Sequence, residues 1–459
     1  MVGKYRAYPE YKPSDVEWLG EVPSGWEVKR IKNTAELNPS KSELQSIAAH
    51  TDITFLPMEA IGETGSIDCS RIKPIREVIN GYTYLGEGDV CLAKITPCFE
   101  NGKAAIMRGL VNGIAFATTE VIPLRCRTTS TAEFLYYLIT CSPFKEQAEG
   151  SMYGAGGQKR VADSFVANYH FAAPPLPEQR QIAKFLDHET AKIDRLIERQ
   201  EKLIALLEEK RQAVISHAVT KGLNPGAPMR HSGIDWLGDI PAHWEVNKIK
   251  NICSKIIDCK NRTPDEVPNG AYYVVRTSSI RDGEFHKEGG YQTDYASFEE
   301  WTQRGVPKIG DILFTREAPT GEACLAPANL DFCLGQRTMA LRPDSQIMTS
   351  KFLLYTIYGP LVRDQIEQKS KGSTVGHLRV GEVGNLPCLV PPIDEQQSIL
   401  DHLTGMHSKF RKLTANALQA KVLLKERRTA LISAAVTGKI DVRDWHAPDE
   451  SESLAQEVA

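Results

Sequence analysis

The sequence lacks the features that mark membrane proteins, secreted proteins and metal-binding proteins. It contains no run of 18 apolar residues, and its first residues have no apolar core like that of a signal peptide. The ten cysteines include no Cys-x-x-Cys pair and the eleven histidines are scattered, so the sequence predicts no metal site. Cys91, Cys253, Cys324 and Cys388 stand among apolar residues, which is typical of buried free thiols. We therefore expect a cytoplasmic protein.

Catalytic motifs are also missing. The Asn/Asp-Pro-Pro-Tyr/Phe motif of enzymes that methylate a base amino group is absent, and the nearest segments, at Asn38-Pro39 and Asn224-Pro225, lack its second proline and its aromatic residue. No Gly-x-x-x-x-Gly-Lys-Ser/Thr loop for ATP is present. The glycines at 154–157 follow a predicted helix and not a strand, unlike a dinucleotide-binding loop. The sequence therefore predicts a binding protein without a catalytic site.

Positive charge is not in excess. The chain has 55 Lys plus Arg against 58 Asp plus Glu, a net charge of −3, and residues 1–173 hold 18 against 20. A DNA-binding domain that acts alone is usually basic, because neutralisation of phosphates supplies most of its non-specific affinity. If this chain binds DNA, its positive charge must be concentrated on one face or supplied in part by a partner subunit.

Two segments of the chain occur twice at a nearly constant offset. Val16–Val28, which begins Val-Glu-Trp-Leu-Gly, returns as Ile234–Val246, 218 residues later. Pro174–Gln179, which reads Pro-Pro-Leu-Pro-Glu-Gln, returns as Pro391–Gln396, 217 residues later. A period of this length is too long for a solenoid unit and indicates a duplicated domain followed by a duplicated helix. Two diverged copies suggest a partner that presents two related but unequal sites.

Four tryptophans belong to this repeat. Trp18 and Trp26 of the first copy return as Trp236 and Trp244. Large aromatic side chains usually supply buried apolar surface. We expect all four to pack the cores of the two domains, because domains that read different partners would not share their reading residues.

Between the repeated segments the two halves share one order of strands and turns. A Gly-Asp turn leads into an apolar strand that ends at a basic residue, Lys94 or Arg316, and a proline follows three residues later. A glycine then begins a second apolar strand, which predicts a hairpin whose loop carries the basic residue. The matched segments are 88–94 and 310–316, 102–106 and 321–325, 124–125 and 341–342, the short helices around 134–137 and 352–355, and the Gly-rich loops 154–161 and 371–380.

The segments after the two double prolines predict long helices. Apolar positions step by four and three residues over about five heptads, which is the pattern of a coiled-coil seam. We expect the two helices to pair with each other in antiparallel orientation; the alternative is that each folds back on its own domain. The predicted seam positions are 182, 186, 189, 193, 196, 200, 203, 207, 210 and 214, with their counterparts 217 residues later.

The first helix has a second apolar strip beside this seam. It contains Ile197 and Ile204, which two paired helices would not fully cover. An apolar strip that stays uncovered usually marks contact with another protein. Ile197 and Ile204 are therefore candidate residues for docking of a partner.

The repeated Trp-Leu-Gly segments, Gly-Asp strands, Pro-Pro-x-x-Glu-Gln helix starts and long helices together resemble the specificity subunit of type I restriction-modification enzymes. The resemblance covers about residues 14–445, with the motifs in order. It implies two target recognition domains, each reading one half of a bipartite, asymmetric site in double-stranded DNA. It also implies that the helices dock two modification (methyltransferase) subunits, to which restriction (motor-nuclease) subunits add. S-adenosylmethionine, ATP and Mg would then belong to these partners, and this chain would need no cofactor.

The resemblance implies an α+β fold with two pseudo-repeated α/β target recognition domains separated by two long antiparallel coiled-coil helices. A structural coiled-coil adaptor that reads no DNA sequence is the alternative function. A fused methyltransferase-specificity protein would need a catalytic domain ahead of Met1. The expected parts are a first target recognition domain (1–175), a first spacer helix (176–224), a second target recognition domain (225–390), a second spacer helix (391–445) and a disordered acidic tail (446–459).

The sequence suggests candidates for contact with DNA, and for each of them an ordinary solvated surface residue is the alternative. Lys94 and Arg316 hold the same loop position in the two halves, where a Lys or Arg can reach guanine or a phosphate. The Gly-rich loops permit close approach of the backbone to DNA. The full set of candidates is Lys94, Asn101, Lys103, Lys159, Arg160, Arg316, Thr320, Ser373, Thr374 and Arg379.

Overall fold

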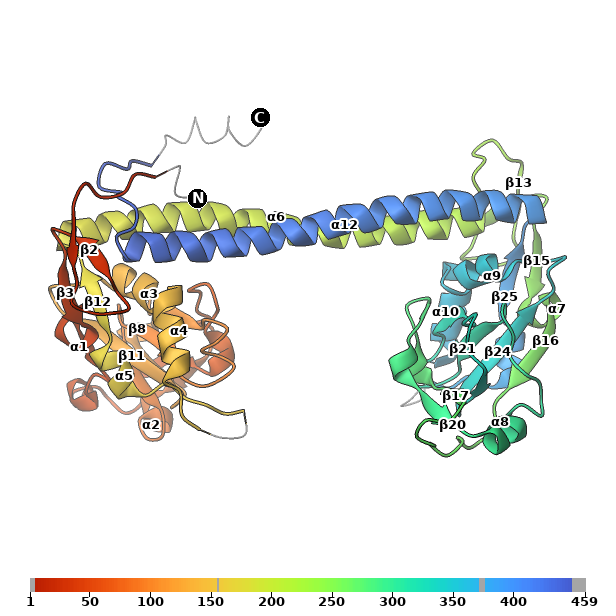
Figure 1. The fold of residues 1–459 in the computed structure, drawn as a ribbon, viewed down its shortest axis with the longest axis horizontal. Coiled ribbons are helices and arrows are strands. Elements are labelled where there is room, and N and C mark those ends of the chain that lie inside the picture. Colours follow the sequence, from red (N-terminus) through yellow and green to blue (C-terminus); the bar gives the residue numbers. More distant parts are fainter. Residues whose placement is uncertain (1–4, 155–156, 371–375, 448–459) are drawn as a thin grey trace. The chain divides into compact units, whose positions relative to one another are not determined.

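The computed structural model describes residues 5–154, 157–370 and 376–447 (Figure 1). Contacts divide the chain into two units. The first unit is the chain up to Glu201 together with the chain from Leu418 onward, and the second is Lys202–Ala417. This division cuts both long helices, α6 (Leu176–Lys221) and α12 (Ile393–Val436), near their middles. Each unit therefore contains one mixed α and β domain and half of each long helix.

The first domain is built on two four-stranded sheets. Its strands are β1 (Tyr11–Pro13), β2 (Glu21–Pro23), β3 (Glu27–Arg30), β4 (Ala35–Leu37), β5 (Asp52–Leu56), β6 (Ile72–Pro74), β7 (Thr83–Gly86), β8 (Val90–Ala93), β9 (Ala104–Ile106), β10 (Ile114–Ala117), β11 (Val121–Cys126) and β12 (His170–Ala173), and its helices are α1 (Ile31–Thr34), α2 (Ile75–Val78), α3 (Ala132–Thr140), α4 (Ser142–Gly150) and α5 (Asp163–Asn168). One sheet is antiparallel, in the order β4-β11-β8-β9, and contains the predicted hairpin. The other, β6-β5-β10-β7, is mixed, with β5 and β10 parallel. Strand β12 pairs with β3.

The second domain repeats this plan. Its strands are β13 (Met229–His231), β14 (Asp239–Pro241), β15 (Glu245–Lys248), β16 (Cys253–Asp258), β17 (Tyr272–Val275), β18 (Ile280–Arg281), β19 (Glu284–Phe285), β20 (Tyr291–Thr293), β21 (Ile312–Thr315), β22 (Ala323–Leu325), β23 (Phe332–Leu334), β24 (Thr338–Pro343) and β25 (Pro387–Val390), and its helices are α7 (Ile249–Ile252), α8 (Tyr295–Trp301), α9 (Ser350–Ile357), α10 (Pro360–Ser370) and α11 (Val380–Gly384). The antiparallel sheet returns as β16-β24-β21-β22, and the mixed sheet as β20-β17-β23. Strand β25 pairs with β15 as β12 pairs with β3. The predicted fold class is confirmed.

A buried ion pair explains the Gly-Asp turn of each domain. The carboxylate of Asp89, which is 1% exposed, accepts hydrogen bonds from Nε and Nη2 of Arg125 on β11 at 2.7 and 2.8 Å. Asp311 and Arg342 repeat this arrangement at the same distances. The hydrogen-bonded aspartate raises the pKa of each guanidinium. The pair fixes the start of β8 or β21 against its neighbouring strand, so the basic residue at the far end has a defined position.

The Glu-Gln pair at each helix start ties the long helix to a domain. In the first unit, Trp26 Nε1 donates to Glu178 Oε1 at 3.1 Å. Gln179, which is 2% exposed, donates to the carbonyl of Thr129 and accepts from the amide of Thr131, the N-cap of α3. The second unit repeats these contacts with Trp244 and Glu395 at 3.1 Å, and with Gln396 against Ile347 and Thr349. Both motifs are therefore structural.

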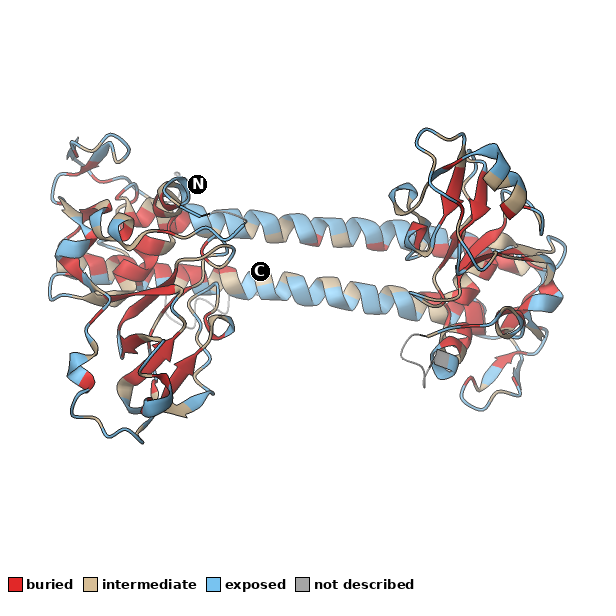
Figure 2. Cartoon of the chain, turned by 90° about the horizontal axis from the view of Figure 1, so that it is seen from below, coloured by how far each residue is buried: buried red, intermediate tan, exposed pale blue. Residues whose placement is uncertain are grey.

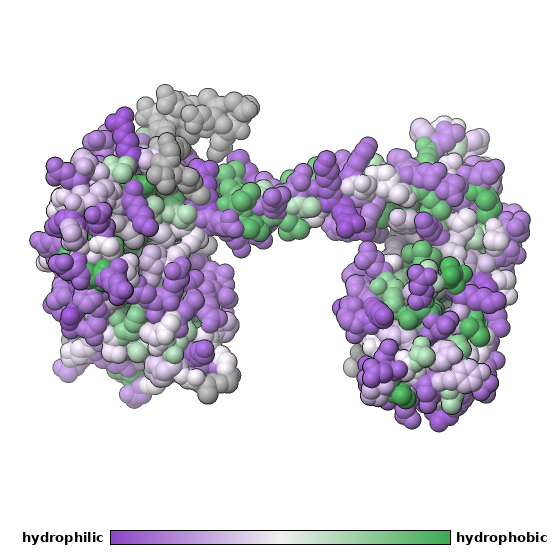
Figure 3. Space-filling model, viewed as in Figure 1, coloured by the Kyte–Doolittle hydropathy of each residue, from purple (hydrophilic) through white to green (hydrophobic). Residues whose placement is uncertain are grey.

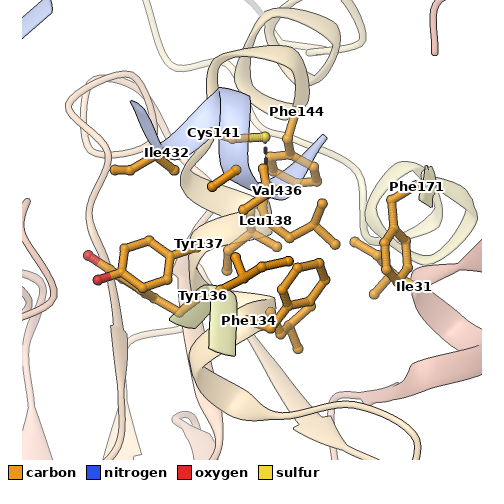
Figure 4. Packing of buried hydrophobic residues seen from close by; sticks show 14 of the residues in the cluster. Ile31, Phe134, Tyr136, Tyr137, Leu138, Cys141, Phe144, Phe171, Ile432 and Val436 are labelled. Atoms are coloured by element: carbon orange, nitrogen blue, oxygen red, sulfur yellow. Dashed lines mark hydrogen bonds between the residues drawn. The ribbon is translucent and has the colours of Figure 1, made fainter. Parts of the chain in front are cut away.

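The C-terminal half of α12 packs on the first domain. Ile432 and Val436 belong to the same buried cluster as Leu138 and Phe144, and Figure 4 shows them close to Cys141. The Cys141 thiol donates to the carbonyl of Leu138 at 3.0 Å. Figure 2 shows the strands of each domain mostly buried, whereas much of the surface of α6 and α12 is exposed. The domain core thus includes a helix from the far end of the sequence.

Within each unit the two long helices run antiparallel. In the first unit, Asp194 on α6 pairs with Arg428 on α12 at 2.8 Å, and Glu201 pairs with Lys421 at 2.7 Å. From the first pair to the second, the residue number increases on α6 and decreases on α12, so the two helices run in opposite directions. In the second unit Ile215 shares a buried cluster with Ile399, and Arg211 and Phe410 line one small cavity, which gives the same direction.

The predicted seam is confirmed where its residues are buried, at Ile182, Leu186, Glu189, Ile193, Ile399, Leu403, Phe410, Ala417 and Leu431. It is wrong at three of its leucines. Leu196 and Leu203 are 39% and 43% exposed, and Leu413 is 50% exposed. Ile197 packs instead against the core of the first unit, and Ile204 is half-buried. Steps of four and three fit two phases of the same heptad, and between residues 193 and 211 of α6 the less exposed positions follow the phase that the apolar pattern did not favour. The strip that was predicted to stay uncovered is therefore covered at Ile197, whereas the three leucines face solvent.

The tryptophans of the repeat divide into two classes. Trp26 and Trp244 are each 1% exposed, as predicted. The prediction that Trp18 and Trp236 also pack the cores is wrong, because they are 38% and 42% exposed. Both stand in a tight loop that is closed by one backbone hydrogen bond, from Ser14 to Gly20 in the first domain and from Ser232 to Gly238 in the second. This loop keeps the tryptophan side chain at the surface.

The cysteines match the prediction of buried thiols at most of the positions named for it. Cys91, Cys324 and Cys388 are buried, and Cys253 is partly buried. Burial raises the pKa of the Cys324 and Cys388 thiols to about 12. Among the described residues, no group of three or more His, Cys, Asp or Glu could hold a metal ion.

Candidate nucleic-acid interface

Three chain segments meet at one corner of the first domain, just past the end of β8. The amide of Lys94 donates to the carbonyl of Glu120 at 2.9 Å, and the amide of Val161 donates to the carbonyl of Lys94 at 2.9 Å. The corner thus joins the hairpin loop, the residue before β11 and the end of the Gly-rich loop. We call it the first corner.

The second domain has the same corner, with the same two bonds. The amide of Arg316 donates to the carbonyl of Arg337 at 2.8 Å, and the amide of Leu378 donates to the carbonyl of Arg316 at 2.9 Å. A cis proline follows in each loop, after Thr96 in the first domain and after Ala318 in the second. The second corner is therefore equivalent to the first in its backbone, and the sequence correctly matched Lys94 with Arg316.

Side chains at the first corner are paired with one another. Arg160 makes a two-bond ion pair with Glu120, from Nε at 2.8 Å and from Nη2 at 2.9 Å. The guanidinium lowers the pKa of the Glu120 carboxyl, and the carboxylate raises the pKa of Arg160. Lys94 Nζ lies 3.8 Å from Asp163, and its side chain is 22% exposed. Two of the predicted cations are thus held by local carboxylates.

The second corner carries a different set of charges. Arg316 Nη2 lies 3.2 Å from Asp258, and the arginine side chain is only 12% exposed. Glu317 lies between Arg337 Nε, at 3.3 Å, and His377 Nδ1, at 3.2 Å. Glu120 of the first corner is replaced here by Arg337, so the sign of the charge is reversed at equivalent backbone positions. The two corners therefore present unlike chemistry on like backbones.

The remaining hairpin-loop candidates have different environments. Lys103 Nζ donates to the carbonyl of Met58 at 2.9 Å, and the Thr320 hydroxyl donates to the carbonyl of Gly376 at 2.5 Å, so both support the loops that carry them. Asn101 is exposed in the turn of the first hairpin loop. It is the one member of this group whose side chain faces solvent without a described hydrogen bond.

The Gly-rich loops hold the two most exposed cations of the predicted set. Lys159 is exposed, while its backbone is fixed by Thr96, whose hydroxyl accepts from the Lys159 amide at 2.9 Å. Arg379 is exposed and is the N-cap residue of α11, with its amide bonded to Glu382 at 2.7 Å. Ser373 and Thr374 lie outside the described residues. A cation on a fixed backbone is suited to a phosphate contact.

Sequence reasoning missed Glu120, Arg337, Glu317 and His377. Glu120 and Arg337 stand at the same place in the repeat, directly before β11 and directly before β24. Because the two residues have opposite charges, the repeat in the sequence does not reveal that they are equivalent. The bonds to Lys94 and Arg316 could be found only from the fold.

Exposed apolar residues gather on the long helices. Figure 3 shows hydrophobic residues among hydrophilic ones on the visible face of the long helices. Those of the first unit are Leu196, Leu418, Val422 and Leu423, between 39% and 56% exposed, and those of the second are Leu203, Leu206 and Leu413. Exposed apolar residues that gather on a helix pair usually mark a protein contact. No helix in the described part of the chain is long and apolar enough to span a membrane.

Comparison with known proteins places this arrangement in a family. Residues 23–208 and 241–422 match the family described as type I restriction modification DNA specificity domain, one match for each half. The two matches cover more than half of the chain. The chain belongs to the type I restriction-modification DNA specificity family.

Individual relatives agree with this assignment. A stretch of 184 residues is 39% identical to the EcoAI specificity subunit of Escherichia coli; it covers 39% of this chain and only 30% of that protein. The EcoEI specificity subunit of the same organism is also 39% identical, and 29% of its length is covered. The putative MjaX specificity subunit of Methanocaldococcus jannaschii is 21% identical over 93% of this chain and 96% of its own length.

Solved structures share the fold. A chain from a structure described as the basis of complex assembly and conformational transition of the type I R-M system superposes with a TM-score of 0.73 at 18% identity, covering 91% of this chain and 99% of that chain. The crystal structure of the HsdS subunit from Thermoanaerobacter tengcongensis gives a TM-score of 0.54 at 19% identity, with 91% and 98% coverage. The duplicated fold of this chain is therefore shared with these two solved structures.

Proposed function

We propose that this chain is the non-catalytic subunit that gives a type I restriction-modification complex its DNA sequence specificity. Each target recognition domain reads one half of a bipartite, asymmetric site in double-stranded DNA. The long helices dock two methyltransferase subunits and so direct adenine methylation; with restriction subunits added, the complex cleaves DNA. The expected parts are those of the sequence, with the domains at 1–175 and 225–390 and the helices at 176–224 and 391–445.

The difference between the two corners carries this proposal. Their backbones make the same pair of hydrogen bonds, while the residue before the middle strand is Glu120 in one and Arg337 in the other. A Lys or Arg reads guanine or binds phosphate, whereas a carboxylate accepts from cytosine, so the two corners suit different bases. Two alike scaffolds with unlike polar surfaces are what a split, asymmetric site requires.

For DNA contact we favour the exposed residues of the predicted set. Lys159 and Arg379 are free to reach phosphates, and Asn101 can reach a base edge. Lys94, Arg160 and Arg316 are already ion-paired, so they would contact DNA only by exchanging a carboxylate for a phosphate or base. Lys103 and Thr320 act through the loops that they hold, and Ser373 and Thr374 stay candidates.

Docking of the methyltransferases is supported by the exposed leucines of the helices. Leu196, Leu203 and Leu413 lie outside the pair, where a further helix could cover them. Ile197 and Ile204, which the sequence suggested for this role, would support the docking surface from the side of the helix that faces the first unit or the paired helix. S-adenosylmethionine, ATP and Mg would be bound by the partner subunits.

Exchange of one domain tests the proposal. Residues 14–173 are replaced with the corresponding half of a relative, and the hybrid is expressed with its methyltransferase subunit. Sequencing of methylated adenines should show one half of the recognised site changed and the other half retained. A change in both halves would contradict the assignment of one domain to one half-site. Methylation at the same sites without this chain would favour the alternative, a structural coiled-coil adaptor.

A further inference from the structure

A short loop before β2 and β14 is built in the same way in both domains. In the first domain, the amide of Ser14 donates to the carbonyl of Gly20 at 2.9 Å, and the amide of Leu19 donates to the carbonyl of Val16 at 3.0 Å. The second domain repeats these bonds, from Ser232 to Gly238 at 3.1 Å and from Leu237 to Ile234 at 3.0 Å. Gly20 and Gly238 have φ of 62° and 66°, which favours glycine. Both loops are therefore held in one fixed conformation.

Each loop holds a tryptophan in solvent. Trp18 and Trp236 are 38% and 42% exposed, and neither indole N–H has a hydrogen-bond acceptor among the described residues. Trp18 lies against the ring of Tyr169, with 5.0 Å between ring centroids. The carbonyl of Tyr169 accepts from the first amide of α1, and in the second domain the carbonyl of Leu386 accepts from the first amide of α7. Leu386 therefore holds the position equivalent to Tyr169, and it is buried. The tryptophan is thus the same in both domains, while the aromatic ring beside Trp18 has no aromatic counterpart at the equivalent position of the second domain.

The tryptophan loops and the corners have diverged to different degrees. At the corners, equivalent positions carry opposite charges, as expected of surfaces that read different DNA. At the loops, an exposed tryptophan is identical in both halves, and the exposed Glu27, Lys32 and Asn33 that follow it are likewise repeated as Glu245, Lys250 and Asn251. An exposed residue kept in two diverged halves is explained if both halves meet the same partner.

The charge around each tryptophan identifies the class of partner. Glu17 and Glu21 flank Trp18, Asp235 and Asp239 flank Trp236, and all four carboxylates are exposed. Carboxylates at matched positions repel DNA phosphates, so they disfavour nucleic acid at these loops. One ammonium also reaches the second loop, where Lys221 donates to the carbonyls of Leu237 and Asp239. An exposed tryptophan is typical of the centre of a protein contact, because tryptophan is enriched among the residues that dominate binding energy.

We propose that the loops at 14–20 and 232–238 are two equivalent docking sites, each for one copy of the same protein. The partner's surface has an apolar pocket for the tryptophan and basic side chains that face the carboxylates. This inference rests on the proposed function, in which the partner present in two copies is the methyltransferase subunit. It adds to the helices a second contact on the domain itself, and the fixed loops lower the entropy that binding must overcome.

The test uses the full-length chain and the purified methyltransferase subunit of the same system. Native mass spectrometry and calorimetry should show two copies bound to the wild-type chain. Trp18→Ala or Trp236→Ala should weaken one of the two binding events about 10-fold or more, and the double variant should weaken both. Tyr295→Ala is the matched control, since this tyrosine is 58% exposed but stands in α8, away from the loops. Thermal unfolding should shift by only a few degrees, because both tryptophans are partly exposed and Trp18 loses one ring contact, with Tyr169.

The possible outcomes separate this inference from the proposed function. If the wild-type chain binds no methyltransferase subunit, the proposed function fails. If two copies bind and the double tryptophan variant binds them with unchanged affinity, the docking loops are wrong while the proposed function stands. The variant Glu17→Lys with Asp235→Lys should also weaken the partner. If these variants change affinity for DNA or self-association of the chain, and not affinity for the methyltransferase, the occupant is different and the inference is overturned.

Discussion

The indole N–H of Trp26 donates to Oε1 of Glu178 at 3.1 Å and so joins the first β-strands of the domain to the first turn of α6. The same carboxylate accepts from the hydroxyl of Tyr8 at 2.6 Å. Burial, followed by the bond to Glu178, raises the pKa of Tyr8. The Glu178 carboxylate therefore accepts hydrogen bonds from two buried donors, at the junction between the domain and the long helix.

Substitution Glu178→Ala should destabilise the first unit by about 2–3 kcal/mol, because it leaves two buried donors without an acceptor. The equivalent Glu395→Ala should cost less, about 1–2 kcal/mol. Its second partner, His243, has a side chain 46% exposed and can turn to water. Hydrogen exchange read separately over the two units measures both effects. Equal losses in the two variants would contradict the role given to Tyr8.

The Asp89→Asn and Asp311→Asn substitutions should each lower the free energy of unfolding by about 2–4 kcal/mol, since each leaves an arginine without its buried counter-charge. The control is Glu43→Gln, which removes the outer partner of Arg125, a carboxylate with a side chain 45% exposed. An exposed pair contributes less than about 1 kcal/mol. Denaturant titration of the three variants checks the ranking, and a loss in Glu43→Gln as large as in Asp89→Asn would refute it.

Buried thiols should resist alkylation until the chain unfolds. Burial raises the pKa of Cys141, Cys324, Cys333 and Cys388 to about 12, so the reactive thiolate is scarce at pH 8. Because the folded-state pKa lies above the unfolded value, their contribution to stability is fully present below about pH 8.5 and is lost as pH rises toward 12. Mass spectrometry after brief iodoacetamide treatment should find Cys98, which is partly exposed, modified first. Early labelling of the buried four would show that the cores open readily.

The repeat made much of this fold readable from the sequence. Three features could be predicted because each has the same structural role in both halves of the chain. They are the Gly-Asp turns, the hairpins that follow them and the Glu-Gln helix starts. The partner of each motif residue was not found, since Asp89 meets Arg125 and Glu178 meets Trp26 only after distant segments come together. A pattern along the chain identifies a residue that matters, and the fold shows what it touches.

The candidate site was less readable, for a related reason. Basic residues at the hairpin ends were correctly placed, but whether a cation is free depends on carboxylates elsewhere in the chain. Asp163 pairs with Lys94, and Asp258 pairs with Arg316. The separation of these residues along the sequence follows no pattern from which the pairs could be predicted. The seam was predicted correctly at both ends of α6 and α12 that pack on a domain, as at Ile182 and Leu431, but not at Leu196 and Leu203. In that middle stretch the heptad pattern fits two phases and does not choose between them.

Lys159→Ala should weaken DNA binding by the assembled complex to a similar degree for cognate and unrelated sequences. Lys159 is exposed on a loop fixed by Thr96, so its expected partner is a phosphate. Loss of one phosphate contact should reduce the slope of log affinity against log salt by about 1. Fluorescence anisotropy at several salt concentrations measures this slope. A selective loss on the cognate sequence would instead assign Lys159 to a base.

Two adjacent residues of α6 separate the observed helix packing from the predicted seam. Ile197 packs against the core of the first unit, whereas Leu196 is 39% exposed. Ile197→Ala should therefore destabilise the first unit by about 1–3 kcal/mol, a range below that of a fully buried isoleucine because the side chain is only partly buried. Leu196→Ala should change the free energy of unfolding by less than about 0.5 kcal/mol, as usual at a surface position.

The same pair reports on the methyltransferase contact. Leu196→Ala should weaken binding of the methyltransferase subunit without affecting stability, because the exposed leucine is available to a partner helix. Chemical unfolding and calorimetric titration of both variants provide the measurement, with Ile197→Val as the conservative control. If Leu196→Ala lowered stability as much as Ile197→Ala, the helices would pair through the predicted seam in solution, and the exposed leucines would not be a docking face.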